Sequence, residues 1–347
     1  MKEDLFSEIV EYFTENNRLH HLVPYDTIAK QITPISISLN RDGNICSIPC
    51  EFNSTNTELQ KLLRKVSTSL YGIHLQPSDN ITITDVEIYN NAKTQPISIT
   101  YRINNLEKRI FIKTYSKARI FGLELENLYA DQSYQFIFND KSIVENAIDG
   151  NSLLEFSKDE LNKMLEEKSF VDALIRHDLK TKLLFLGDNH RGNNLVIRNE
   201  FRTKKEQNHT YFLRSIDFDS LFMIENLEQC KYRNYCQSPH RILTDEELTD
   251  KTIYTKINEL SKRDVEEIVE DEKTRIKQEL EKKKERFEKL TEIISMSFNC
   301  ENNDQTKLKK FQSLLKYIQN RIPNLNVSKC KNYAQLLKEY VYFELDI

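Results

Sequence analysis

The sequence predicts an α+β protein of two lobes, a small antiparallel β lobe with one helix and a larger, mostly helical lobe. Two patterns predict it: strand-like alternation dominates from residue 81 to 146, and helical periodicity dominates from residue 157 onward. A chain of 347 residues with 39% hydrophobic residues is long and apolar enough to bury a sizeable core.

The order of these patterns divides the chain into four parts. An N-terminal helix and hairpin extension packs on the small lobe, and the β lobe itself follows. The core of the helical lobe comes next, and a helical C-terminal part ends the chain. The boundaries are 1–79, 80–146, 147–242 and 243–347.

The N-terminal extension contains three expected elements. Residues 1–16 read as a helix with its apolar residues on one face. Residues 34–50 read as a hairpin that turns at Arg41-Asp42-Gly43, and residues 57–71 read as a second helix.

The β lobe begins with three β-rich runs joined by short polar loops, and these predict an antiparallel meander. The runs are ITITDVEIY, PISITYRIN and KRIFIKTYS. The run GLELENLYA then has helical composition, and SYQFIFN and KSIVEN add two short strands.

The second half is mostly helical. Residues 157–177 read as one helix, and three short strands surround a polar motif, in the runs LLFLGD, NNLVIRN and YFLRSIDF. From residue 243 onward everything reads as helix. This part includes a long charged helix near 262–298, and the last two helices cover 307–321 and 332–343.

The bulk properties exclude several classes of protein. A net charge of −4 and a pI near 6.1 argue against a nucleic-acid binder. The scattered cysteines suggest no disulfide framework, and no apolar run approaches the roughly 20 residues that span a bilayer. The acidic N-terminus is a poor secretory signal. We expect a soluble, cytoplasmic protein, and secretion into a host cell without a signal peptide stays open.

Three polar residues carry the chemistry. Asp188 follows an apolar run, Asn193 comes five positions later before another, and Asp217 follows a further strand-like run. Phosphoryl transfer needs a carboxylate that orients the attacking hydroxyl, and a metal held against the phosphates. Mg²⁺ takes one or two carboxylates plus phosphate oxygens. We therefore expect the three residues to face one pocket.

Several motifs resemble the protein-kinase-like superfamily. GDNHRGNNLV resembles the catalytic loop of aminoglycoside and choline kinases, and equally the GD-x-H-x-x-N loop of phosphoinositide kinases. SIDFD resembles the metal-binding IDF motif, RIFIKTYS the V-A-I-K strand, and IVENAIDGNSLLEF the aminoglycoside-kinase hinge. The resemblance covers about residues 80–240 and depends on the order of the motifs. It implies a bilobal kinase-like fold.

The resemblance also implies the nucleotide-binding residues. Lys113 would contact the α- and β-phosphates of ATP, and Glu124 or Glu126, both in the run FGLELENLY, would orient that lysine through an ion pair. Glu145 and Asn146 lie where the adenine edge would meet the hinge backbone.

The catalytic and metal-binding roles follow in the same way. Asp188 would accept the proton of the substrate hydroxyl or orient that hydroxyl. Asn193 and Asp217 would bind Mg²⁺ or Mn²⁺. His190 occupies a position implicated in catalysis in the lipid-kinase branch and structural elsewhere.

The chain departs from the superfamily in several ways, of which two bear on the substrates. The turn between the first two strands of the meander, NNAKTQP, has no glycine, so ATP must be covered without a Gly-rich loop. No segment like A-P-E follows the SIDFD motif, so the platform for a protein substrate is not recognisable.

Simpler interpretations compete with these assignments. Asp188 and Asn193 are also common turn residues, and Lys113 alone would read as a solvated strand-end lysine. Gly187 and Gly192 have the spacing of a P-loop but lack the Lys-Ser/Thr that follows one. A set of Cys230, Cys236 and His240 lacks a fourth ligand, in a spacing that matches no common zinc module.

The long charged helix reads mainly as a solvated face, because its charges alternate in sign at helical spacing. The densest basic clusters offer an alternative, an anion site for an inositol polyphosphate or a phosphoinositide head group. Their residues are Lys282, Lys283, Lys284, Lys307, Lys309 and Lys310.

Together these observations predict an ATP- and Mg²⁺-dependent phosphotransferase, an atypical protein Ser/Thr kinase with a protein substrate. The pattern resembles secreted effector kinases of intracellular bacteria such as Legionella. A small-molecule or phosphoinositide kinase is the alternative within the same fold. A pseudokinase or binding scaffold is the alternative of another class.

Overall fold

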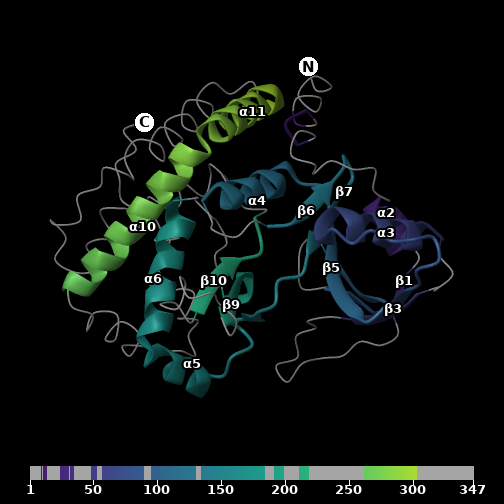
Figure 1. Cartoon of the computed structure of the whole chain (residues 1–347), viewed down its shortest axis with the longest axis horizontal. Coiled ribbons are helices and arrows are strands. Elements are labelled where there is room, and N and C mark those ends of the chain that lie inside the picture. Colours follow the sequence, from purple (N-terminus) through teal and green to yellow (C-terminus); the bar gives the residue numbers. More distant parts are fainter. Residues whose placement is uncertain are drawn as a thin grey trace. The chain divides into compact units, whose positions relative to one another are not determined.

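The structure is a computed structural model that separates the chain into two compact units. It describes residues 9, 11–13, 24–30, 32–34, 48–52, 57–89, 95–129, 134–183, 191–198, 211–218 and 262–302. Unit 1 comprises residues 1–117 and 132–148, and unit 2 comprises residues 118–131 and 149–347 (Figure 1). The four-part division expected from the sequence stays a prediction.

Unit 1 is built on a seven-stranded antiparallel sheet in the order β1-β2-β3-β4-β5-β7-β6. The strands are β1 Ile32–Pro34, β2 Ile48–Phe52, β3 Ile81–Ile88, β4 Ile97–Ile103, β5 Leu106–Thr114, β6 Phe136–Phe138 and β7 Ser142–Asn146. The predicted meander and both added strands are confirmed. β1 and β2 pair as the expected hairpin requires, and its residues 35–47 lie outside the described part of the chain.

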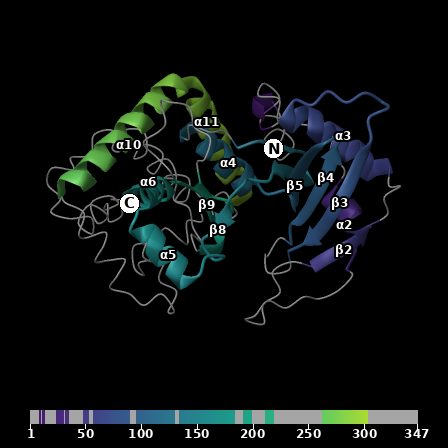
Figure 2. The ribbon, with the colours of Figure 1, turned by 60° about the horizontal axis from the view of Figure 1, so that its bottom comes forward.

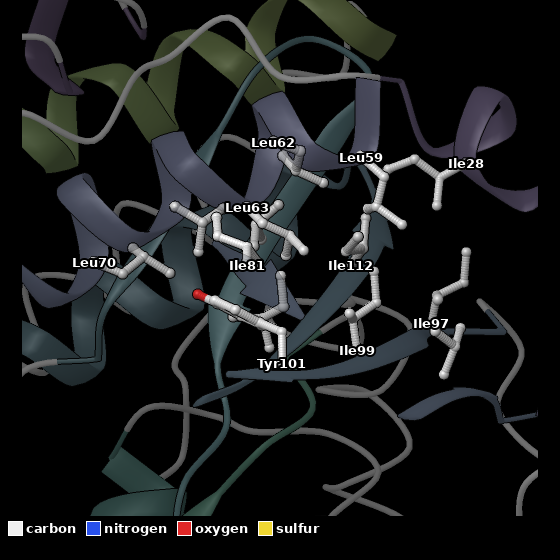
Figure 3. Packing of buried hydrophobic residues seen from close by; sticks show 14 of the residues in the cluster. Ile28, Leu59, Leu62, Leu63, Leu70, Ile81, Ile97, Ile99, Tyr101 and Ile112 are labelled. Atoms are coloured by element: carbon white, nitrogen blue, oxygen red, sulfur yellow. The ribbon is translucent and has the colours of Figure 1, made fainter. Parts of the chain in front are cut away.

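The helices of unit 1 include α2 Tyr25–Ala29 and α3 Thr57–Tyr71, and residues 11–13 are also helical. The periodicity predicted α3 with its observed bounds. Its leucines recur at spacings of three and four, which places them on one face. Leu59, Leu62, Leu63 and Leu70 contribute to one buried cluster with Tyr101 and other side chains of the sheet (Figure 3).

Alternation along β5 determines which face of the sheet is buried. Ile110 and Ile112 are fully buried in the cluster below α3. Neighbouring residues of a strand point to opposite faces, so Arg109, Phe111 and Lys113 lie on the other face. The sheet of unit 1 therefore has an apolar face under α3 and a face that carries polar groups.

Unit 2 contains five described helices of two turns or more and a small sheet. The helices are α4 Lys117–Tyr129, whose first residue belongs to unit 1, α5 Lys158–Leu165, α6 Lys168–Leu183, α10 Lys262–Lys282 and α11 Lys284–Asn302. The antiparallel strands are β8 Asn151–Ser152, β9 Asn194–Arg198 and β10 Tyr211–Ser215, in the order β10-β9-β8. A 3₁₀ turn at Arg191–Asn193 precedes β9. α6 packs against both β10 and α10 (Figures 1 and 2).

The helix predicted over residues 157–177 is wrong in one respect, because two helices cover it. Ser157 and Glu160 form a reciprocal capping box at the start of α5. The amides of Glu166 and Glu167 then bond to carbonyls three residues back, a tighter turn than the α-helix makes, and α6 begins at Lys168. α6 continues to Leu183, where the sequence suggested the start of a strand.

The long charged helix is also divided, at Lys283 between α10 and α11. The ammonium group of Lys283 donates to the carbonyl oxygens of Asn127 (2.7 Å) and Leu128 (3.3 Å) near the end of α4. Because these partners are distant in sequence, the local pattern of charges could not predict a break at Lys283. The predicted α+β class with a β-rich and a helix-rich part is confirmed. Within the described residues, no helix combines the length and apolar character needed to cross a bilayer.

Candidate functional site

The polar face of unit 1 carries a buried ion pair. Lys113 on β5 and Glu145 on β7 are each only 7% exposed, and Nζ of Lys113 donates to Oε2 of Glu145 at 2.9 Å. The two strands are neighbours, and their register places Phe111 opposite Glu145. Lys113 is therefore held by the sheet that bears it, which suits a cation that must meet phosphate oxygens at a fixed place.

A second network lies beside this pair on the same sheet. Arg109 donates to Oε2 of Glu87 (2.9 Å), to the hydroxyl of Tyr89 (2.5 Å) and to the hydroxyl of Ser98 (2.8 Å). Burial raises the pKa of Tyr89 to about 12, so its phenol is neutral at physiological pH. The ring of Phe111 lies 5.8 Å from that of Tyr89, edge to face. These contacts fix the side chains that flank Lys113.

The residues predicted to form the hinge are engaged through their backbone. The amide of Asn146 donates to the carbonyl of Gln135 (3.2 Å), and the amide of Ala147 donates to the carbonyl of Arg109 (2.9 Å). Glu145 lies between β5 and β6 in the sheet. The adenine contact at Glu145 and Asn146 stays a prediction, and a base edge there would have to use groups other than these two amides.

In unit 2, the β9–β10 hairpin places the backbones of the two predicted metal ligands at the same end. Ser215 pairs with Asn194, and the amide of Ile216 donates to the carbonyl of Asn193 at 3.0 Å. Asn193 therefore precedes β9 and Asp217 follows β10 at the same end of the hairpin. Both residues are partly exposed. Residues that are 24 positions apart in the chain thus lie at the same end of the hairpin because of antiparallel pairing.

A buried histidine on α6 supports this hairpin. Nε2 of His177 donates to Oδ1 of Asn194 at 2.5 Å and lies 3.4 Å from the hydroxyl of Ser215. Burial, reinforced by the nearby Lys180, lowers the pKa of His177 to about 3, so its ring is neutral. His177 was not predicted from the sequence. The one signal that could have indicated it is a polar side chain at a position that the helical periodicity of α6 expects to be buried.

The helix α4 contacts the same segment through two residues that the sequence analysis also missed. Nη2 of Arg119 donates to Oδ1 of Asp217 at 3.1 Å, and Arg119 is 1% exposed. At Gly122, an added Cβ would lie 2.5 Å from Cβ of Phe218. Phe218 is therefore packed directly against the backbone of α4 at Gly122.

The two glutamates proposed to orient Lys113 are both fully buried on α4. Glu124 forms an ion pair with Arg286 of α11, and Glu126 forms one with Lys180 of α6. Each carboxylate thus has a cation within unit 2. The assignment of Glu124 or Glu126 as the partner of Lys113 stays a prediction.

Several predicted site residues lie outside the described residues. These are Asp188, His190, Lys307, Lys309 and Lys310. Lys282 and Lys284 are strongly exposed, whereas Lys283 is turned toward α4 and also pairs with Glu279 at 2.6 Å. The middle lysine of the predicted anion site is therefore part of the helix packing.

The donor set at the hairpin end suits a magnesium ion that arrives with a nucleotide. One carboxylate (Asp217) and one amide (Asn193) are hard oxygen ligands, and phosphate oxygens would complete the coordination. Among the described residues, no three His, Cys, Asp or Glu side chains form a group that could hold a metal by themselves.

Comparisons with known proteins return weak structural likenesses. No protein-family model and no curated protein matches the sequence. A Plasmodium vivax ethanolamine kinase is 10% identical with a TM-score of 0.31, over 78% of this chain and 90% of that chain. A thermostable aminoglycoside phosphotransferase, solved with AMP-PNP and hygromycin B, is 6% identical with a TM-score of 0.25, over 69% of this chain and 94% of that chain. Because both TM-scores are low, the chemistry proposed below rests on the chain's own residues.

Proposed function

We propose that this chain is an ATP- and Mg²⁺-dependent phosphotransferase with an alcohol group as acceptor. The observation that supports the proposal is the register of the β9–β10 hairpin, in which the amide of Ile216, the residue before Asp217, donates to the carbonyl of Asn193. An amide and a carboxylate together are the ligands that a magnesium–nucleotide complex needs from a protein.

Each residue has a defined part in this proposal. Lys113 would offer a buried ammonium group to the phosphates, and its ion pair with Glu145 would keep that group in place. Asn193 and Asp217 would hold the metal, which neutralises charge that develops on the phosphoryl group. Asp188, five residues before Asn193, would orient the acceptor hydroxyl and take its proton.

We further propose that the acceptor is a Ser or Thr hydroxyl of a protein, as in an atypical protein kinase. Action as a secreted effector on host targets, and control by an inositol polyphosphate at Lys282 and Lys284, belong to the same proposal. The loop GDNHRGNNLV resembles small-molecule and phosphoinositide kinases equally. A small alcohol or a lipid head group is therefore the second candidate acceptor.

A transfer assay with [γ-³²P]ATP and Mg²⁺ tests these acceptors. Generic protein substrates, choline and ethanolamine, an aminoglycoside and phosphoinositide vesicles are offered in parallel. The proposal expects label in one class, and loss of at least about a hundredfold with Asp217→Ala, since metal-held charge stabilisation amounts to several kcal/mol. Asn193→Ala should lose less, because it removes a neutral ligand.

Asp271→Asn is the matched control, because Asp271 is an exposed carboxylate of the same unit. It should keep full activity. A binding scaffold would give no transfer with any acceptor, and its binding of a partner would survive Asp217→Ala. These two results together would contradict the phosphotransferase proposal and support a binding scaffold.

A further inference from the structure

Arg119 stands beside the carboxylate that the proposed function gives to the metal. It lies in the first turn of α4, and its Nη2 is 3.1 Å from Oδ1 of Asp217. The side chain of Arg119 is 2% exposed and that of Asp217 is 35% exposed. The cation is thus buried behind the carboxylate, and solvent reaches the carboxylate from its other side.

Packing fixes this arrangement. The Cβ of Phe218 lies so close to Gly122 that a methyl group there would approach it to 2.5 Å. Gly122 follows Arg119 by three positions, so one turn of α4 contacts both Asp217 and Phe218. The ion pair and this backbone contact lie at adjacent points of one helix. The packing of Phe218 on Gly122 therefore restrains the backbone of Asp217 beside the guanidinium group.

A metal ion must therefore approach Asp217 with Arg119 still in place. Arginine does not lose its proton at any physiological pH, so its charge persists beside the site. A free divalent cation bound to the same carboxylate is repelled by that charge. Phosphate oxygens that arrive with the metal supply negative charge and offset the repulsion.

We propose that Arg119 is a specificity-determining residue of this site, which makes Asp217 reject free divalent cations and accept a cation complexed with a polyphosphate. This inference rests on the proposed function, because it takes Asp217 as a metal ligand. In addition to that function, Arg119 would make the site prefer the metal–nucleotide complex to the free metal ion. Arg119 itself touches neither the phosphoryl group nor the acceptor.

Binding of Mn²⁺, followed by electron paramagnetic resonance, tests the inference without any turnover. Arg119→Met removes the charge and keeps most of the side-chain length, whereas Arg119→Lys keeps the charge. We expect Arg119→Met to bind free Mn²⁺ about tenfold or more tightly than the natural chain does. Removal of one like charge about 5 Å from a divalent ion has this effect even in a water-like dielectric. Arg119→Lys should stay close to the natural chain, and the preformed Mn²⁺–ADP complex should gain less from Arg119→Met than the free ion does.

The natural chain gives a second measurement that needs no variant at position 119. It should bind the Mn²⁺–ADP complex more tightly than free Mn²⁺, and equal affinities would overturn the inference. Unchanged or weaker binding of free Mn²⁺ by a folded Arg119→Met chain would overturn it as well, and would make Arg119 a brace for Asp217.

The double variant Arg119→Met, Asp217→Asn distinguishes a failure of the proposed metal site at Asp217 from a failure of the proposed role of Arg119. If it loses the Mn²⁺ bound by Arg119→Met, Asp217 is a ligand and the role of Arg119 is judged by the comparisons above. If it keeps that Mn²⁺, the metal lies elsewhere and the proposed function loses its metal site.

Discussion

Lys113 and Glu145 form a buried ion pair across β5 and β7, with Nζ 2.9 Å from Oε2. Both residues belong to the same sheet, so the position of the ammonium group is set within unit 1. Removal of one partner of a buried pair leaves a charge with an unfavourable environment, whereas removal of both can be nearly neutral.

The first prediction follows from this asymmetry. Lys113→Met should lower the free energy of unfolding by about 3 kcal/mol, because it leaves the carboxylate of Glu145 buried without this partner. The double variant Lys113→Met, Glu145→Met should recover most of the loss. Urea denaturation measures both values. Lys61→Met, in an exposed pair with Glu58, is the control and should change stability by less than about 1 kcal/mol. Equal stabilities of the single and double variants would contradict the prediction.

The second prediction concerns the close contact of Gly122 with Phe218. Gly→Ala inside a helix normally stabilises a protein by about 1 kcal/mol. Here the new methyl group would lie 2.5 Å from Cβ of Phe218, so Gly122→Ala should instead destabilise the protein by about 1–3 kcal/mol through overpacking. It should also lower transferase activity, because Asp217 precedes Phe218. Thermal unfolding and the transfer assay measure the two effects.

Gly72→Ala separates the steric effect from a backbone effect. Gly72 has a φ of +65° and nothing within 4 Å of an added Cβ. This change should cost about 1–2 kcal/mol from backbone strain alone and leave activity intact. If Gly122→Ala raised stability, the contact with Phe218 would not be as tight as described.

The third prediction uses the pH dependence of stability. The pKa of His177 is about 3 in the folded protein and about 6.5 in an unfolded chain, so only the unfolded chain takes up a proton between these values. Its contribution to stability is complete above about pH 6.5 and is lost as the pH falls toward 3. Between about pH 7 and pH 5 this loss should reach about 2 kcal/mol.

His177→Asn should flatten that part of the profile, at the expense of lower stability at neutral pH. Urea titrations of both proteins at the two pH values give the difference. His74→Gln changes an exposed histidine and should leave the natural profile as it is. A His177→Asn chain that still lost the same 2 kcal/mol would assign the effect to other groups.

The fourth prediction distinguishes three consecutive lysines. Lys283→Met should lower the free energy of unfolding by about 1–2 kcal/mol, since its charged hydrogen bonds to the carbonyls of Asn127 and Leu128 are lost. Lys282→Met and Lys284→Met replace exposed side chains and should stay within about 0.5 kcal/mol of the natural chain. Chemical denaturation of the three variants is sufficient. Three similar values would show that the break between α10 and α11 does not depend on this contact.

The sequence predicted the elements of unit 1 well because their signals are local. The alternation in β3, β4 and β5 and the leucine spacing of α3 come from residues a few positions apart. The breaks at Glu166 and Lys283 were missed for the opposite reason. One is a change from α-helical to 3₁₀ bonding within a continuous helical pattern, and the other accompanies contacts with residues 155 and 156 positions away.

The candidate site divides along the same line. Asn193 and Asp217 could be predicted because each adjoins a short strand, and antiparallel pairing of those strands brings their ends together. Arg119, Gly122 and His177 could not be predicted, because no pattern near them in the sequence indicates that α4 and α6 contact this hairpin. Their roles depend on tertiary contacts between residues distant in sequence, and such contacts produce no local pattern from which they could be predicted.

The order of synthesis gives the contact between Lys283 and α4 a further consequence. The ribosome completes Asn127 156 residues before Lys283, and at roughly 5–20 residues per second this interval is on the order of ten seconds. During that time the newly made helix has neither the lysine that caps its carbonyls nor the arginine that neutralises Glu124. Glu124 and the last turn of α4 therefore reach their partners on the C-terminal helices only after translation has passed residue 286.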